Sequence, residues 1–181
     1  MSSQQALYTS PIADSKNVLF VENRIVVDKP HTVVFDWVTN WANLNKWLPV
    51  AHSTKVLNGQ ENAPSQLGDV LWEDVKANID HLSPVPIPKY YTVVAHVPGF
   101  LWSVAGEDGV RDSSGNEKGD GKIKWVAVFT TFPLEDGKTL YCREFQQIRD
   151  ADDKGDGRKK VLDSATIQKG LERLKAAVEA L

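Results

Sequence analysis

The spacing of apolar side chains changes along this chain, and that change constrains the fold more than any other feature. Residues 18–27 settle into an alternation of apolar and polar side chains, which is typical of a strand. From residue 30 to 49 the apolar residues recur every three or four positions, which predicts two short helices with a break near Asn40. Pro49 ends this region, because a residue that precedes proline avoids the helical conformation.

The rest of the chain shows strand patterns followed by one long helix. Strands are predicted at 52–57, 68–75, 90–97, 100–106, 123–132 and 139–148. Val97–Gly99 and Leu134–Lys138 carry the residues of tight hairpin turns. An amphipathic helix with a continuous apolar stripe is predicted over 161–181. This order of elements suits an antiparallel sheet that curls around one helix.

Composition fits a single domain. The chain has 181 residues, of which 41% are hydrophobic and 25% are charged, and this length suffices to bury a sizeable core. Residues 1–17 are polar and are expected to form a flexible tail, whereas residues 18–181 form the domain. The apolar runs are shorter than the ~20 residues that a spanning helix needs, so no membrane span is expected.

Charge and cysteine content argue against other classes of protein. The net charge is −3 and no basic cluster exceeds Arg158–Lys160, so binding to nucleic acid is not expected. Cys142 is the single cysteine, which rules out an internal disulfide framework. Because the N-terminus also lacks a targeting pattern, we expect a cytoplasmic protein.

The sequence predicts neither a metal site nor a cofactor. The histidines have no paired spacing with one another or with the cysteine, and they stand at His31, His52, His81 and His96. No nucleophile elbow, phosphate-binding loop or dinucleotide fingerprint is present. His96 is expected on the outward face of its strand, as an ordinary surface histidine.

The N-terminal half carries a pattern that matches a known family. Within VENRIVVDKPHTVVFDWVTNWANLNKWLP, the matching residues are Ile25, Val27, Pro30, Val34, Phe35, Val38, Asn40, Trp47 and Pro49. Gly68, the DGKT turn and the LERLKAAVE helix agree further along. On these residues the chain resembles the START/Bet v 1-like (SRPBCC) superfamily over about residues 18–181.

The resemblance implies an α+β helix-grip fold. Its features are a seven-stranded curved antiparallel sheet, two short helices after the first strand, a long C-terminal helix that the sheet wraps around, and an internal cavity. The loops at 77–89 and 107–121 are longer than the family usually has. They could cover the mouth of a pocket or only extend an edge of the sheet.

The C-terminal helix carries a glycine among its large apolar residues. Gly170 lies on the same face as Leu171 and Leu174, and a glycine inside a helix costs about 1 kcal/mol relative to alanine. Close packing of a strand against the helix would compensate for this cost, and so would space for a ligand. All three residues are candidates for ligand binding.

Aromatic residues dominate the predicted inward face of the sheet. If the larger apolar side chains of the strands point inward, the candidate ligand-binding residues are Trp72, Phe100, Trp102, Trp125, Phe129 and Phe145. Trp41, in the short helices, could lie near the mouth of the cavity and is a further candidate. Such a lining suits an aromatic or polycyclic compound, although tryptophan also serves as core filler. Trp37 and Trp47 are expected to pack the short helices onto the sheet.

The same assignment turns four polar side chains inward as catalytic candidates, namely Arg143, Asp74, Tyr91 and Tyr141. A guanidinium is not left unpaired in an apolar interior, so Arg143 should meet Asp74 or an oxyanion of the ligand. In an enzyme, Arg143 would stabilise an enolate, a tyrosine would donate a proton and Asp74 would act as the base. A shift of register by one residue would place Glu73, Cys142 and Glu144 inside instead.

The resemblance implies three classes of function. Polyketide cyclases of the family bind a hydrophobic substrate and promote its cyclisation and dehydration without a cofactor, and this is our leading hypothesis. The first alternative is a non-catalytic carrier of a lipid, quinone or other hydrophobic metabolite. The second is a protein-interaction module like the chaperone-activating relatives.

Overall fold

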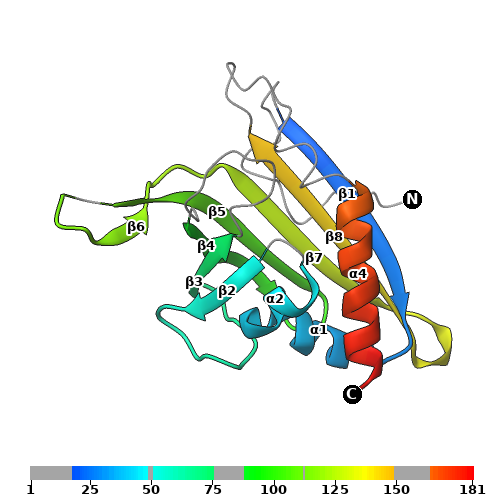
Figure 1. The fold of residues 1–181 in the computed structure, drawn as a ribbon. Coiled ribbons are helices and arrows are strands. Elements are labelled where there is room, and N and C mark those ends of the chain that lie inside the picture. Colours follow the sequence, from blue (N-terminus) through cyan, green and yellow to red (C-terminus); the bar gives the residue numbers. More distant parts are fainter. Residues whose placement is uncertain (1–17, 49–50, 76–87, 112, 149–163) are drawn as a thin grey trace, which may run out of the picture.

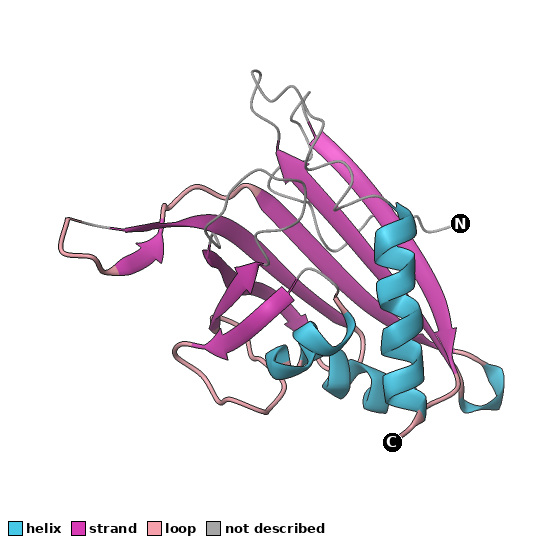
Figure 2. Cartoon of the chain, in the orientation of Figure 1, coloured by secondary structure: helices cyan, strands magenta, loops and turns pink. Residues whose placement is uncertain are grey.

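A long curved antiparallel sheet forms most of the fold (Figures 1 and 2). The computed structural model describes residues 18–48, 51–75, 88–111, 113–148 and 164–181. The strands are β1 (Val18–Val27), β2 (Ala51–Val56), β3 (Val70–Val75), β4 (Pro88–Val97), β5 (Leu101–Arg111), β6 (Glu117–Gly119), β7 (Trp125–Pro133) and β8 (Thr139–Ile148). Their order in the sheet is β1-β8-β7-β5-β4-β3-β2, and β6 pairs with β5 outside this path.

Short helices follow β1, as the apolar spacing predicts. They are α1 (His31–Thr39), η1 (Trp41–Asn43) and α2 (Leu44–Trp47), and a further 3-10 turn, η2 (Glu135–Gly137), joins β7 to β8. The break falls at Asn40, whose backbone leaves the helical region and whose Oδ1 accepts a 3.2 Å hydrogen bond from the N–H of Ala42. The side chain of Asn40 therefore caps η1 and separates it from α1.

The C-terminal helix α4 (Ser164–Glu179) lies alongside the edge strand β1 (Figure 1). The Nζ atom of Lys175 donates a 2.8 Å hydrogen bond to the carbonyl of Val26. Oε1 of Glu179 accepts a 2.7 Å bond from the N–H of Asp28. These polar contacts bind backbone groups at the edge of the sheet, which would otherwise face solvent.

The main core lies between the concave face of the sheet and the helices. From α4 it receives the fully buried stripe of Ile167, Leu171, Leu174 and Val178. Trp47 is buried in this core and Trp37 packs against it, which agrees with their predicted packing role. The order of elements and the curved sheet with its terminal helix confirm the predicted helix-grip fold.

The segment at 107–121 is a β-hairpin arm, and its assignment as a loop is wrong for most of its length. β5 continues to Arg111 and pairs with β6, so that the arm projects from the sheet (Figure 1). Gly119 lies so close to Glu107 that a Cβ atom there would stand 2.1 Å from the carboxylate. The Gly- and Asp-rich composition suggested a loop, but Gly109 and Gly119 pair with each other in the ladder between β5 and β6.

Several predictions concern residues outside the described part of the chain. They are the tail at 1–17, most of the loop at 77–89, and the helical residues 161–163. Within the described residues, no helix is long and apolar enough to cross a membrane.

Candidate functional site

Cross-strand pairing decides which side chains face the helices. Arg143 on β8 stands opposite Phe129 on β7, which stands opposite Trp102 on β5. Further along the strands, Trp125 pairs with Gly106, and Gly106 pairs with Tyr91 on β4. Side chains that are paired in this way point to the same face of the sheet. Here that face is the concave one.

The aromatic rings of this face form a continuous line of contacts. Successive ring centroids are 6.0 Å apart for Trp125–Tyr91, 5.0 Å for Tyr91–Trp41, 6.0 Å for Trp41–Trp102, 4.8 Å for Trp102–Phe129 and 6.4 Å for Phe129–Tyr141. Trp41 comes from η1, and its Nε1 donates a 2.9 Å bond to the carbonyl of Trp72, which fixes its ring over the sheet.

Most of the predicted ligand-binding residues lie in this buried interior. They are Trp41, Trp102, Trp125, Phe129, Phe145, Leu171 and Leu174 in the main core, together with the buried Gly170. Two others lie elsewhere. Trp72 faces outward, where the Nζ atom of Lys55 stands 5.0 Å from the centre of its ring. Phe100 is 37% exposed and packs on Phe132, because the chain is still in the turn before β5.

The predicted inward face of β3 is wrong by one residue. Leu71 pairs with Tyr91, so Leu71 and Glu73 point inward, whereas Asp74 points to the opposite face and is only half-buried. Residues 70–75 have no clear alternation of apolar and polar side chains, so the pattern could not identify the inward face. Glu73, which is 2% exposed, is therefore the interior carboxyl group that the sequence analysis assigned to Asp74.

The structure joins Glu73 to one of the predicted catalytic residues. The Tyr91 hydroxyl donates a 2.6 Å hydrogen bond to Oε2 of Glu73. Burial raises the pKa of Glu73 to about 7, even though the hydrogen bond from Tyr91 and the charges of Lys89 and Arg143 oppose this rise. Burial also raises the pKa of Tyr91 well above its ordinary value, with the charge of Glu73 adding to the effect. Glu73 can therefore exchange protons near neutral pH.

Arg143 is buried without an ionic partner among the described residues. Its side chain is 4% exposed, and its Nε and Nη1 atoms donate no hydrogen bond there. The Cζ atom lies 5.2 Å from the ring centre of Phe145 and 6.0 Å from that of Phe129. Burial lowers the pKa of Arg143, yet a guanidinium stays charged at neutral pH. The predicted pairing with Asp74 is wrong because that carboxylate lies on the other face.

The fourth predicted catalytic residue, Tyr141, lies beside Arg143 on the inward face of β8. Its side chain is fully buried, and its hydroxyl has no hydrogen-bond partner in the described part of the chain. Burial raises the pKa of this hydroxyl. Tyr141 therefore stays protonated at neutral pH and can donate a hydrogen bond.

A β-bulge places His96 on the concave side, which corrects its predicted outward position. The register shifts between Val93 and Ala95, so that His96 pairs with the inward-facing Trp102. Its ring stacks on Phe35 of α1, with the centroids 5.6 Å apart. A bulge inserts one residue into the alternation and thereby reverses the facing of all later residues in the strand.

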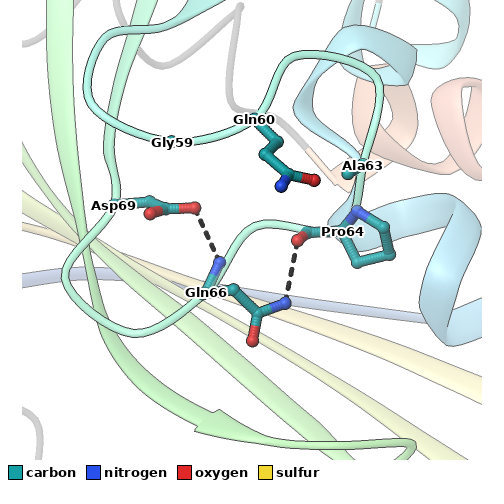
Figure 3. Close-up of a pocket in the computed structure, with 6 residues that line it drawn as sticks. All are labelled: Gly59, Gln60, Ala63, Pro64, Gln66 and Asp69. Atoms are coloured by element: carbon teal, nitrogen blue, oxygen red, sulfur yellow. Dashed lines mark hydrogen bonds between the residues drawn. The ribbon is translucent and has the colours of Figure 1, made fainter.

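A separate pocket lies outside the concave face, in the connection between β2 and β3 (Figure 3). It measures about 410 Å³ and is lined by Gly59, Gln60, Ala63, Pro64, Gln66 and Asp69. The Asp69 carboxylate accepts a 2.8 Å bond from the N–H of Gln66, and the Gln66 amide donates to the carbonyl of Pro64. These contacts stabilise the connection itself. The described residues contain no group of three side chains that could hold a metal ion.

Comparisons with known proteins identify the fold. No protein-family model matches the sequence, and no curated protein matches it. A START superfamily protein from Mycobacterium smegmatis has a similar structure, with a TM-score of 0.63 and 17% identity over 89% of this chain and 97% of its own.

Two further solved structures agree. Ara h 8.0201 has a TM-score of 0.60 and 11% identity over 91% of this chain and 99% of its own. Protein CV1439 from Chromobacterium violaceum has a TM-score of 0.56 and 22% identity over 90% of this chain and 97% of its own. The chain therefore shares its fold with these solved structures, one of which is a START superfamily protein.

Proposed function

We propose that the chain binds a hydrophobic, aromatic or polyketide-like small molecule between the concave face of the sheet and α4, and promotes its cyclisation and dehydration. The observation that carries this proposal is the hydrogen-bonded pair of Tyr91 and Glu73, which lies among aromatic rings. Burial raises the pKa of its carboxyl group to about 7. A carboxyl group with a raised pKa inside an apolar lining is typical of a catalytic acid or base.

The aromatic line supports the binding step. Tyr91, Trp41 and Trp102 present adjacent rings from β4, η1 and β5, and such rings pack well against a flat or unsaturated ligand. The internal cavity predicted from the sequence is part of this proposal. It would have to lie next to these rings for the ligand to reach Glu73.

The proposed reaction uses Glu73 twice. As a carboxylate, it takes a proton from a carbon atom between two carbonyl groups, and the resulting enolate attacks a further carbonyl to close a ring. The protonated Glu73 returns that proton to the alkoxide, which becomes a hydroxyl group. Glu73 then takes the second proton from the same carbon and passes it to the hydroxyl, which leaves as water while the carbon–carbon double bond forms. The hydroxyl of Tyr91 holds the carboxylate in place. The steps lose one water molecule and need no oxidant or reductant.

A non-catalytic carrier is the second candidate. The buried donors of Arg143, Tyr141 and Trp102 lack partners within the described residues, and they could hold the oxygen atoms of a ligand without any chemistry. In that case Glu73 would bind the ligand and never change it.

Mass spectrometry of the purified protein, native and then denatured, tests for a co-purifying small molecule. Turnover of a synthetic poly-β-ketone is then followed through the absorbance of the new ring. We expect Glu73→Gln to bind the ketone and to lower turnover by about a hundredfold or more. The matched variant Asp74→Asn, on the opposite face, should keep wild-type turnover. Unchanged turnover in Glu73→Gln would leave only the carrier, and a protein that binds no ligand at all would refute both candidates.

A further inference from the structure

Hydrogen-bond donors without acceptors gather around one aromatic ring in the interior. The ring of Phe129 lies 4.8 Å from the ring of Trp102, 6.4 Å from that of Tyr141 and 6.0 Å from Cζ of Arg143. Nε1 of Trp102, the hydroxyl of Tyr141, and Nε and Nη1 of Arg143 are all buried and lack a partner in the described ranges. We call Trp102, Tyr141 and Arg143 the donor cluster.

The groups next to the donor cluster do not supply the missing acceptors. Asn23 stands opposite Arg143 on β1, but its Oδ1 accepts no hydrogen bond from Nε or Nη1 of Arg143, and its Nδ2 atom donates to Gln168 of α4. Glu73 accepts its bond from Tyr91 and forms no ion pair with Arg143. A buried polar group without a partner is costly, and a buried charge is far more so. The donor cluster is therefore an arrangement that a negatively charged acceptor would stabilise.

A second cation near the interior, Lys89, is already neutralised. Lys89 stands 4.7 Å from the ring centre of Trp125, and its Nζ atom forms an ion pair with Asp108. Asp108 also pairs with Lys124 at 2.7 Å. Lys124 also pairs with Asp120 at 3.0 Å, so around Lys89 two lysines meet two carboxylates. The charge of Glu73 acts on Arg143 without an ion pair, and Arg143 has no ionic partner within the described ranges. The surroundings of Lys89 and of Arg143 therefore differ in their ion pairs.

We infer that the ligand is an organic acid that binds as its anion, with its charged oxygen atoms at Arg143, Tyr141 and Trp102. This inference rests on the proposed function, because it assumes that a small molecule enters the interior. An enolate that exists only during the reaction would leave Arg143 uncompensated in the resting complex, whereas a carboxylate compensates it throughout. A planar guanidinium also matches the two oxygens of such a group.

The position of Trp41 orients the rest of the ligand. Its ring contacts Trp102 of the donor cluster on one side and Tyr91 on the other. With its anionic end at Arg143, the apolar body of the ligand passes Trp41 and brings its other end to Tyr91 and Glu73. The donor cluster is thus a positioning site. A neutral hydrocarbon would leave its donors unsatisfied, and a lipid ester would leave the charge of Arg143 uncompensated.

Two fluorescent probes with the same ring system test this inference. Anilinonaphthalene sulfonate carries a permanent negative charge, and phenylnaphthylamine has the same rings without the sulfonate. The dissociation constants of both probes are measured for the wild type, Arg143→Met, Arg143→Lys and Arg24→Met. The last variant is the matched control, since Arg24 lies on the neighbouring strand and its side chain is exposed.

We expect the wild type to bind the sulfonate more tightly than the neutral probe. Arg143→Met should weaken sulfonate binding by about tenfold or more, because it removes a charge-assisted hydrogen bond, and should leave the neutral probe unaffected. Arg143→Lys should recover part of the loss, and Arg24→Met should bind both probes like the wild type. Tyr141→Phe, which keeps the ring, provides a second test should Arg143→Met not fold.

Other outcomes separate this inference from the proposed function. If both probes bind equally well and Arg143→Met changes neither, the interior binds hydrophobic molecules but has no preference for anions, and the inference is wrong. If Arg24→Met weakens sulfonate binding as much as Arg143→Met does, the probe binds at the surface, and the inference is again wrong. If neither probe binds the wild type, the proposed function fails and the inference fails with it.

Discussion

The hydroxyl of Tyr91 on β4 donates a 2.6 Å hydrogen bond to Oε2 of Glu73 on the neighbouring strand β3. This bond stabilises the charged form of a carboxyl group whose burial favours the neutral form. Together with the charges of Lys89 and Arg143, these effects leave the pKa of Glu73 at about 7. One substitution removes the hydrogen bond, which makes the pair a direct test of the proposed site.

Tyr91→Phe removes the hydrogen bond and keeps the ring. Because the bond lowers the pKa of Glu73, its loss should raise that pKa above the wild-type value of about 7. Carboxyl-carbon NMR of selectively labelled protein would follow the titration. A Glu73 pKa that stays the same or falls in Tyr91→Phe would show that the hydroxyl does not stabilise the carboxylate.

Glu73 should make the protein less stable as the pH rises. Its pKa is about 7 in the folded state against an ordinary value of 4.5, so between these values the folded state holds a proton that the unfolded state has released. The free energy of unfolding should therefore fall by about 3 kcal/mol from pH 4.5 to pH 7.

Urea denaturation across this pH range checks the expectation. Glu73→Gln should lose most of the decline, whereas Asp74→Asn, the same change on the opposite face of β3, should retain it. Parallel curves for the wild type and Glu73→Gln would contradict a buried carboxyl group at this position.

Arg143→Met should increase the free energy of unfolding by about 1 kcal/mol or more. The substitution replaces a buried and unpartnered charge with an apolar side chain of similar length. Arg24→Met, on the exposed side, should change stability by no more than about 0.5 kcal/mol. Thermal and urea unfolding of both variants measure this difference. A large loss of stability in Arg143→Met would mean that Arg143 has a structural role rather than a ligand-binding one.

Gly106→Ala should destabilise the fold through Trp125. A Cβ atom at residue 106 would stand 1.7 Å from Nε1 of Trp125, so the indole must leave its contact with Tyr91. We expect a loss of about 1–3 kcal/mol, the usual cost of overpacking a core.

The double variant Gly106→Ala/Trp125→Leu isolates the cause of that loss. With the indole gone, the additional effect of the alanine should be small, which a double-mutant cycle measures as coupling between the two positions. An equal loss in both backgrounds would mean that the alanine acts through the backbone instead.

Local patterns predicted some parts of the site correctly. The strand predicted over residues 139–148 coincides with β8, because the aromatic residues Tyr141 and Phe145 stand two positions before and after Arg143 and so share its face. This spacing is enough to turn Arg143 inward. The break at Asn40 was also predictable, since the side chain of an asparagine can cap the helical turn that follows it.

Elsewhere, distant neighbours override the local pattern. In β3 the inward residues are Leu71 and Glu73 because Leu71 pairs with Tyr91, which lies on another strand. In β4 the bulge between Val93 and Ala95 turns His96 inward. Both outcomes depend on hydrogen bonds between strands, and neither can be predicted from the sequence of the strand concerned.

Apart from β6 and the end of β5, the sequence by itself determined the order of the strands and main helices, their approximate bounds and the apolar stripe of α4, because these follow from side-chain periodicity within one segment. Only the tertiary structure decided that Glu73 rather than Asp74 meets Tyr91, and that Arg143, Tyr141 and Trp102 surround Phe129. These residues come from separate strands, and the register between strands is set by pairing and packing over the whole sheet.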